Sequence, residues 1–402
     1  MSHYLIVGAG QAGLSLVATL RAEGFEGAVT LIGNEKVPPY QRPPLSKAYL
    51  LGEMSKEQLL LRPISYYRDN DIDLRLGQSV RIIDPKERSV TLSNNETLTY
   101  DALALTTGSV PRKLPQKFGG QLKGVFTVRN LTDIAKMATY FETGRRVLIV
   151  GGGYIGLEAA AVAAKRGLRV TLVETAARIL KRVACKETSD FFRLLHQNHG
   201  VDIREGLGLK LLHGEEHVEA AILEDGTTLK IDFAIVGVGV SPAVELAKQA
   251  DLEIADGIVT DQQARTSDPF IWAAGDCATS VFRGQRLRIE SVGNAIDQAE
   301  VAAKSMMGKE ACYNPQPWFW SDQYDCKLQI AGLNHGYTDV IIRNGESFRS
   351  HWYYIAESLI AVDSMNDVRG YMVGKRLIEA GKTAPKYLVA DASSDLKPLL
   401  AN

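Results

Sequence analysis

The sequence predicts an α/β protein in which two doubly wound, parallel-sheet domains precede a smaller α+β domain. The first observation is a repeated glycine motif, GAGQAG at residues 8–13 and GGGYIG at residues 151–156. The second is its context, because each copy follows a short apolar run, residues 4–7 or 147–150, and opens an apolar stretch of helical character. Strand, glycine turn and helix in this order begin a βαβ unit that binds a dinucleotide.

Both copies have the chemistry that holds a pyrophosphate. Glycine is needed because a side chain would block the approach of the backbone to the phosphates, whose charge is then attracted by the helix N-terminus. A single motif of this kind is weak evidence for dinucleotide binding, but two copies in matching contexts are strong evidence. The chain is therefore expected to bind two dinucleotides.

The strand after each glycine unit is expected to carry the group that binds the adenosine ribose. In the second unit the strand at residues 170–173 is followed by Glu174. A carboxylate accepts a hydrogen bond from a free 2′-hydroxyl and repels a 2′-phosphate, so Glu174 favours NAD over NADP. Arg178, Lys181 and Arg182 follow closely and keep phosphate binding open as an alternative.

The first unit differs at the equivalent place. Its second strand, residues 29–32, is followed by Gly33, which has no side chain to offer. The ribose contact must then come from Asn34 or Glu35, and the sequence does not choose between them.

Composition places the chain among ordinary globular proteins. Its 402 residues suffice for two or three domains, and 45% are hydrophobic and 23% charged. The net charge of −1, from 46 basic and 47 acidic side chains, argues against nucleic acid as a partner. No apolar run approaches the roughly 20 residues of a membrane span. The first strand begins near His3, which leaves no room for a targeting peptide, so we expect a cytoplasmic location.

Cysteine and histidine give no pattern typical of a metal site. The four cysteines are scattered without a C-x-x-C pair, so we expect free thiols and neither zinc, an iron-sulfur cluster nor a disulfide. His196 and His199 lie three residues apart before Gly200, and we expect both at the surface. The cysteines are Cys185, Cys277, Cys312 and Cys326.

The repeat extends beyond the glycine turns and predicts the domain boundaries. A strand-rich stretch ends in residues 102–108, and a second one ends in the similar residues 234–242. Later segments alternate apolar and polar residues like strands, as at residues 327–330 and 352–355, before a closing helix near residues 372–377. We predict a discontinuous first nucleotide domain (1–111 and 238–312), a second nucleotide domain (112–237) and an α+β domain (313–402).

Four further motifs carry a resemblance over nearly the whole chain. They are PPYQRPPLSK at residues 38–47, AGDC at 274–277, ESV at 290–292 and WFWSDQY at 318–324. In this order they resemble the FAD-dependent, NADH-oxidising ferredoxin reductases of bacterial oxygenase systems, the putidaredoxin reductase type. The resemblance implies two Rossmann-like domains in a glutathione reductase-like arrangement, with FAD on the first domain and NAD(H) on the second. It also implies a 2Fe-2S ferredoxin as acceptor, which would feed a monooxygenase or dioxygenase.

The resemblance assigns site residues one by one. FAD contacts are implied for Gly8, Gly10, Ala12, Gly13, Asn34, Glu35, Arg42, Lys47, Val80, Thr107, Gly108, Arg129, Asp276, Val292 and Trp320. NAD contacts are implied for Gly151, Gly153, Tyr154, Ile155, Gly156, Glu158, Glu174, Gly237 and Gly239. Asp276 suits the ribityl chain because a carboxylate accepts from hydroxyls, and its alternative role is that of a helix N-cap.

Three of these residues are expected to serve the reaction itself. By resemblance Lys47 and Glu158 lie where flavin and nicotinamide meet and can form an ion pair, while Trp320 shields the flavin. Cofactors of this kind carry the chemistry, and the protein supplies orientation and electrostatics. The alternative for Glu158 is an ordinary acid in the first turn of its helix, favourable to the helix dipole.

Other functions on the same scaffold can be weighed against this one. Disulfide reductases place a cysteine pair, and NADH peroxidases a single cysteine, behind the first glycine motif, and residues 34–60 contain no cysteine. A rubredoxin reductase differs only in its acceptor and stays open. A flavoprotein similar to apoptosis-inducing factor, which binds NADH as a signal, also shares the motifs, although such a protein would require an N-terminal targeting segment.

Overall fold

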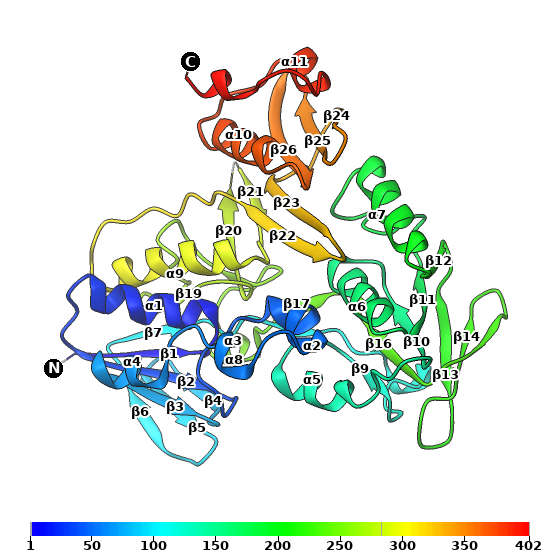
Figure 1. Ribbon diagram of the computed structural model, residues 1–402. Helices are drawn as coiled ribbons and strands as arrows, with labels where there is room; N and C mark the ends of the chain where they lie inside the picture. Colours follow the sequence, from blue (N-terminus) through cyan, green and yellow to red (C-terminus); the bar gives the residue numbers. More distant parts are fainter. Residues whose placement is uncertain (1, 283, 402) are drawn as a thin grey trace. The chain divides into compact units, whose positions relative to one another are not determined.

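A computed structural model describes residues 2–282 and 284–401, drawn in Figure 1. The chain divides into two units, and each consists of three chain segments. The first unit contains Met1–Gln41, Lys56–Val110 and Ser241–Pro317, and the second contains Arg42–Ser55, Pro111–Val240 and Trp318–Asn402. None of the helices in the described part of the chain is long and apolar enough to cross a membrane.

The first unit contains a parallel sheet of five strands in the order β19-β7-β1-β2-β3. The strands are β1 (His3–Val7), β2 (Ala28–Gly33), β3 (Ile72–Leu76), β7 (Ala102–Leu105) and β19 (Ile271–Ala273). Strand β1 pairs with β2 on one side and β7 on the other, so that Val7 lies opposite both Ile32 and Leu105. Because β1 is central and fully paired, the glycine turn that follows it lies at the carboxyl edge of the sheet, where ligands of such sheets bind.

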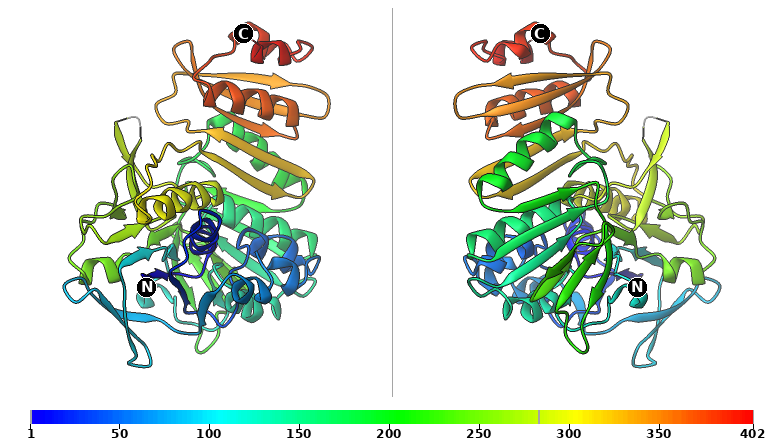
Figure 2. Two further views of the ribbon diagram at one scale, coloured as in Figure 1. Left: turned by 90° about the vertical axis from the view of Figure 1, so that its left-hand side faces the viewer. Right: turned by 90° about the vertical axis from the view of Figure 1, so that its right-hand side faces the viewer.

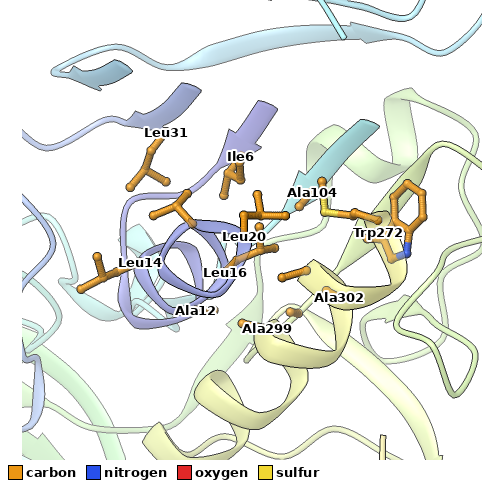
Figure 3. Packing of buried hydrophobic residues seen from close by; sticks show 14 of the residues in the cluster. Ile6, Ala12, Leu14, Leu16, Leu20, Leu31, Ala104, Trp272, Ala299 and Ala302 are labelled. Carbon is orange, nitrogen blue, oxygen red and sulfur yellow. The ribbon is translucent and has the colours of Figure 1, made fainter. Parts of the chain in front are cut away.

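Two helices of the first unit pack together against this sheet, α1 (Gln11–Ala22) and α9 (Val292–Met306). Figure 3 shows Leu16 and Leu20 of α1 directed toward the strands, and Ala299 and Ala302 of α9 beside that helix. All four side chains are fully buried. The alanines allow the helix backbones to approach closely, which fixes the position of the helix that begins at the first glycine turn.

The second unit repeats this arrangement with the strand order β12-β11-β10-β16-β9. Its strands are β9 (Val125–Phe126), β10 (Arg146–Val150), β11 (Arg169–Glu174), β12 (Asp202–Glu205) and β16 (Phe233–Val236), and its helices here are α6 (Tyr154–Lys165) and α7 (Lys186–Asn198). Val150 lies opposite Val173 and Val236, just as Val7 lies opposite Ile32 and Leu105. The two glycine motifs therefore occupy the same place in two equivalent sheets.

Each parallel sheet is accompanied by a small antiparallel one. In the first unit these strands are β4 (Val80–Asp84), β5 (Ser89–Leu92) and β6 (Thr97–Thr99), and in the second they are β13 (Leu209–His213), β14 (Ala220–Leu223) and β15 (Thr228–Lys230). The first unit also contains a sheet of β18 (Ile258–Val259), β20 (Ala278–Phe282) and β21 (Gln285–Leu287).

The C-terminal part of the second unit forms an antiparallel sheet in the order β22-β23-β26-β25-β24. Its elements are β22 (Trp318–Gln323), β23 (Cys326–Gly332), β24 (Asp339–Asn344), β25 (Arg349–Ile355), β26 (Ser358–Met365), α10 (Val368–Glu379) and α11 (Lys386–Ala390). Helix α10 lies across the strands, in orange-red in Figure 2, and packs on β23 and β26. The expected strands at residues 327–330 and 352–355 and the expected closing helix are confirmed.

The remaining elements are short. They are η1 (Pro43–Ser46), α2 (Ala48–Leu51), α3 (Lys56–Leu59), α4 (Ile64–Asp69), β8 (Ser109–Pro111), η2 (Gln116–Phe118), α5 (Leu131–Ala138), β17 (Val240–Pro242), α8 (Glu245–Gln249) and η3 (Lys397–Leu400). The boundaries of the three predicted domains stay a prediction, and their outer ends, residues 1 and 402, lie outside the described residues.

Candidate active site

The first glycine turn combines two tightly packed glycines with one open position. Gly8 has a φ of +120°, and a Cβ there would lie 2.2 Å from the carbonyl oxygen of Thr106. A Cβ on Gly13 would lie 2.0 Å from the carbonyl oxygen of Gly8. By contrast, a Cβ on Gly10 would meet nothing within 4 Å. Gly8 and Gly13 close the turn, and the space beside Gly10 at the start of α1 fits a bound pyrophosphate.

The second glycine turn has the same division of roles. Gly151 has a φ of +107°, and its Cβ would lie 2.5 Å from the carbonyl oxygen of Gly237. A Cβ on Gly156 would lie 2.1 Å from the carbonyl oxygen of Gly151, whereas one on Gly153 would meet nothing within 4 Å. This turn, at the start of α6, also fits a pyrophosphate.

Glu174 ends β11 beside the second glycine turn. Its Oε2 accepts from the backbone N–H of Gly152 at 2.7 Å, and its Oε1 accepts from that of Ala176 at 2.7 Å. These bonds hold a carboxylate next to the pyrophosphate position, as recognition of a ribose 2′-hydroxyl requires.

The nearby Arg178 is engaged in holding the chain before α7. Its guanidinium donates to the carbonyl oxygens of Cys185 at 3.1 Å and Ala184 at 2.8 Å, and to the hydroxyl of Ser189. Arg178 thus has a structural role of its own in this unit. Lys181 and Arg182 are exposed.

The corresponding end of β2 in the first unit is built differently. A Cβ on Gly33 would lie 2.5 Å from the Cβ of Ala9, so this position has no room for a carboxylate. The Glu35 carboxylate accepts from the Tyr40 hydroxyl at 2.7 Å, while Asn34 is exposed. The choice between Asn34 and Glu35 as ribose ligand stays open.

Four further predicted FAD residues make hydrogen bonds within their own unit. In the first unit Asp276 accepts from Ser109 Oγ at 2.8 Å, and Thr107 Oγ1 donates to the carbonyl oxygen of Ala243 at 2.7 Å. In the second unit Arg42 Nη1 donates to the carbonyl oxygen of Arg129 at 2.8 Å. Of the other predicted residues in the first unit, Ala12 and Val80 are buried, Gly108 has a φ of +70° and Val292 is the first residue of α9.

The alternative role of Asp276 as a helix N-cap is wrong. Strand β20 follows it at Ala278, and the cap of α9 is Ser291, whose hydroxyl accepts from the N–H of Asn294. Asp276 therefore has no capping role that would account for a carboxylate at this place.

Glu158 and Lys47 form a buried ion pair within the second unit. Lys47 Nζ lies 2.9 Å from Glu158 Oε1, and the two side chains are 13% and 3% exposed. Two hydroxyls also donate hydrogen bonds to the Glu158 carboxylate. Ser321 Oγ donates to Oε1 at 2.6 Å, and Ser46 Oγ donates to Oε2 at 2.6 Å. The expected ion pair is present, and its two serine partners were missed by the sequence analysis.

The alternative for Glu158, an ordinary acid in the first turn of its helix, is wrong. Helix α6 begins at Tyr154, its first turn contains no acid, and Glu158 points into the protein. The only signal for Ser46 and Ser321 was their place beside Lys47 and Trp320 inside the two motifs PPLSK and WFWSDQ.

Trp320, on strand β22, lies beside the Lys47–Glu158 ion pair. Lys47 Nζ is 6.0 Å from the centroid of its ring, and the ring stacks on Trp318 at 5.5 Å with an interplanar angle of 21°. Both tryptophans line a cavity of about 200 Å³, together with Phe319, Asp322, Lys327, Gln329 and Tyr371. A cation, an anion and an aromatic plane are thus gathered around the middle of β22.

Two more predicted residues follow the second glycine turn. Tyr154 packs on Phe319 with ring centroids 4.8 Å apart, and burial strongly raises the pKa of its hydroxyl. Ile155 is 43% exposed although it is apolar. Gly237 and Gly239 lie in the loop after β16, where the Gly237 carbonyl packs on the glycine turn.

The cysteines and histidines differ in part from expectation. All four cysteines are free thiols, and three are buried while Cys312 is exposed. His199 is at the surface as expected, but His196 is fully buried. It lies on the inward face of α7, which a spacing of three residues at a helix end did not reveal.

Among the described residues, one group has metal-ligating atoms close together, namely Cys185, His351 and Asp363. Arg349 Nε donates to His351 Nε2 at 2.9 Å, so the ring proton is on Nδ1, which donates to Thr188 Oγ1 at 2.7 Å. The Thr188 hydroxyl in turn donates to Asp363 at 2.7 Å. Because the imidazole presents no lone pair toward the carboxylate and thiol, the group is a hydrogen-bonded network rather than a ligand set.

Comparison with known proteins covers the whole chain. The family model described as pyridine nucleotide-disulphide oxidoreductase matches residues 2–299. The chain belongs to this family. A second model, described as reductase C-terminal, matches residues 318–400 of this family member.

Individual relatives of this oxidoreductase are similar over their full length. It is 40% identical to the 5,5′-dehydrodivanillate O-demethylase ferredoxin reductase subunit of a Sphingobium species, covering 100% of this chain and 99% of the relative. It is 39% identical to the putidaredoxin reductase of Pseudomonas putida, covering 99% and 97%. Its fold matches the crystal structure of a covalent putidaredoxin reductase-putidaredoxin complex with a TM-score of 0.96 and 39% identity, covering 100% of this chain and 98% of the other.

Proposed function

We propose that this oxidoreductase is an FAD-dependent NADH:ferredoxin reductase, which passes electrons from NADH to a 2Fe-2S ferredoxin that serves a monooxygenase or dioxygenase. The observation that carries the proposal is the likeness of the whole chain, both glycine turns and the C-terminal sheet included, to ferredoxin reductases. The absence of cysteine from residues 34–60 speaks against the disulfide reductases and peroxidases of related architecture.

FAD is assigned to the first glycine turn. In the first unit the proposed ligands are Gly8, Gly10, Ala12, Gly13, Asn34, Glu35, Val80, Thr107, Gly108, Asp276 and Val292. Arg42, Lys47, Arg129 and Trp320 are assigned to it by the same resemblance. When bound, FAD supplies the change from a two-electron hydride donor to a one-electron acceptor. Asp276 is suited to hold ribityl hydroxyls because it is a carboxylate that no helix cap requires.

NADH is assigned to the second glycine turn. The proposed ligands are Gly151, Gly153, Tyr154, Ile155, Gly156, Glu158, Glu174, Gly237 and Gly239. Glu174 favours NADH over NADPH because a carboxylate repels a 2′-phosphate, and Arg178, the nearest basic side chain along the sequence, holds the start of α7.

Lys47 and Glu158 are proposed to orient the nicotinamide and to balance charge during hydride transfer. Their ion pair is buried, so its electrostatic effect is little screened by water. The two serines hold the carboxylate in place beside Lys47, whose Nζ also lies 3.4 Å from the carbonyl oxygen of Pro43. Trp320 is proposed as the flavin neighbour that excludes water on the side of the C-terminal sheet.

The predicted domain division belongs to this proposal, with FAD on residues 1–111 and 238–312, NAD(H) on 112–237 and a third domain at 313–402. The match of a separate family model to residues 318–400 supports the last boundary. A cytoplasmic location is proposed with it.

The decisive experiment is reduction of cytochrome c by the purified yellow protein with NADH, with and without a small 2Fe-2S ferredoxin, and again with NADPH. We expect ferredoxin to stimulate the rate strongly with NADH. Preference for rubredoxin would make the chain a rubredoxin reductase. Flavin reduction without stimulation by either carrier, and with slow reoxidation, would favour the NADH-sensing role of proteins similar to apoptosis-inducing factor.

A further inference from the structure

A chain of hydrogen bonds leads from Glu158 to the protein surface through three fully buried side chains. Ser321 Oγ lies 2.6 Å from Glu158, and Gln323 Nε2 lies 3.1 Å from Ser321 Oγ. His196 Nε2 lies 2.8 Å from Gln323 Oε1, and the Tyr324 hydroxyl lies 3.1 Å from His196 Nδ1. All five residues belong to the second unit. Tyr324 also stacks on the exposed His199, with ring centroids 3.6 Å apart.

The chemistry of these groups fixes the direction of every bond. Glu158 pairs with Lys47 and accepts only, so the Ser321 hydroxyl must donate to it. Ser321 then accepts from the Gln323 amide N–H, which leaves Gln323 Oε1 to accept from His196 Nε2–H. His196 Nδ1 is consequently the acceptor of the Tyr324 O–H. Each donor points toward Glu158, and such chains polarise their members and strengthen one another.

The surroundings of His196 keep this direction stable. Burial lowers the pKa of His196 to about 4, with a smaller contribution from His199. The imidazole is therefore neutral at physiological pH, so one ring nitrogen donates a hydrogen bond and the other accepts one. The titratable groups facing Glu158 are Lys47, from the turn before α2, and Tyr154 of its own helix, while those facing His196 are Tyr324 and His199.

We propose that Ser321, Gln323 and His196 are positioning residues for Glu158, which hold its carboxylate in one rotamer beside Lys47. The kinetic part of this inference rests on the proposed function of Lys47 and Glu158. An amide N–H does not exchange its proton along such a chain, so Gln323 makes the chain an orienting device rather than a path for protons. It ties helices α6 and α7 to strand β22, on which Trp320 lies.

The direction of the chain is testable without any turnover. Long-range proton-nitrogen NMR of the holoprotein labelled with ¹⁵N-histidine reports the tautomer and charge of each imidazole, and His196→Gln identifies the signal of His196. We expect a neutral Nε2–H tautomer from pH 5.5 to 8. A protonated ring at pH 6, or an Nδ1–H tautomer, would overturn the proposal. Gln323→Glu places a carboxylate against the ring and should raise the pKa of His196.

The positioning role is tested by the rate of flavin reduction by NADH in stopped-flow experiments. Ser321→Ala should lower the limiting rate about 10-fold, because a misplaced reacting group slows transfer, while the Kd of NADH changes less than about twofold. Ser321→Thr, which keeps the hydroxyl, should restore most of the rate. His196→Leu should slow reduction and His196→Gln, which keeps an N–H toward Gln323, should recover it.

The matched control is Ser364→Ala, since Ser364 is a fully buried serine of the same sheet whose hydroxyl has no partner among the described residues. It should leave the limiting rate unchanged. Equal rates in Ser321→Ala and Ser364→Ala would refute the positioning role. If NADH failed to reduce the wild-type flavin, the proposed function would fail instead, and the histidine spectra would still decide the direction of the chain.

Discussion

The two glycine-turn units are the same scaffold with different chemistry at two equivalent positions. In both, the first and last glycines close on a neighbouring carbonyl and the middle glycine faces open space. At the end of the second strand, however, Gly33 in the first unit stands where the second unit has Glu174. Two residues beyond the last glycine, Ser15 stands where the second unit has Glu158. The two units thus share the geometry of the glycine turn and differ in the side chains at these two positions.

The structure gives a physical reason for each difference. Gly33 packs on Ala9, so only a residue without a Cβ fits there. Ser15 is uncharged, and its hydroxyl accepts a hydrogen bond at 3.3 Å from the side chain of Gln11 in the same helix. Glu158 instead receives three donors from segments far away in the sequence.

The shared scaffold can be broken by adding one methyl group to either unit. Gly8→Ala and Gly156→Ala each place a Cβ within about 2 Å of a backbone oxygen, so we expect a loss of more than about 4 kcal/mol of unfolding free energy or no folded protein. Thermal unfolding followed by circular dichroism measures this. Gly10→Ala and Gly153→Ala are the matched controls in protein freed of bound nucleotides, since their Cβ atoms meet no protein atom within 4 Å, and their melting temperatures should stay within about 3 °C of that of the unsubstituted apoprotein.

In the second unit Glu158 forms an ion pair with Lys47, whereas the first unit has the uncharged Ser15 at the equivalent position; Lys47→Ala removes the pair. Because Glu158 is left buried without its cation, we expect flavin reduction by NADH to slow about 100-fold and unfolding free energy to fall by about 3 kcal/mol. Stopped-flow absorbance and urea unfolding give the two values. A reduction rate within twofold of wild type would remove Lys47 from the reaction.

The buried histidine makes the second unit sensitive to acid. The pKa of His196 is about 4 in the folded protein against a usual 6.5, so the unfolded chain binds a proton below pH 6.5 that the folded protein does not take up. Stability should therefore fall as the pH drops from 6.5 toward 4. His196→Gln cannot bind this proton, and between pH 7.5 and 4.5 it should lose roughly 2 kcal/mol less than wild type in urea unfolding. Equal losses would show that His196 is not buried as a neutral group.

The smallest effect is expected at the ribose position. Glu174→Ala should raise the KM of NADH about 10-fold, because one charged hydrogen-bond acceptor is lost. It should also narrow the preference for NADH over NADPH, since the repulsion of a 2′-phosphate is gone. Steady-state kinetics with both nucleotides measure the change, and Asn34→Ala, which lies outside this unit, should leave the ratio between them unaltered.

Sequence reasoning reached the fold class and most of the scaffold from local signals. Glycines with positive φ, such as Gly8 and Gly151, and apolar runs on both sides of them are required by the turn itself. The same holds for Glu174, whose place follows from the length of a βαβ unit. The Lys47–Glu158 pair was reached through resemblance, because nothing in the spacing of residues 47 and 158 indicates that they meet.

What the sequence by itself determined is therefore the repeated βαβ scaffold and its family, since these depend on backbone conformation and short-range patterns. Only the tertiary structure decided that Glu158 is buried, that Ser46 and Ser321 bind it, and that His196 lies inside the protein. Hydroxyl and imidazole groups have no preferred spacing, and they become partners only when segments more than a hundred residues apart fold against each other. A buried carboxylate needs such partners because it cannot stay charged without them.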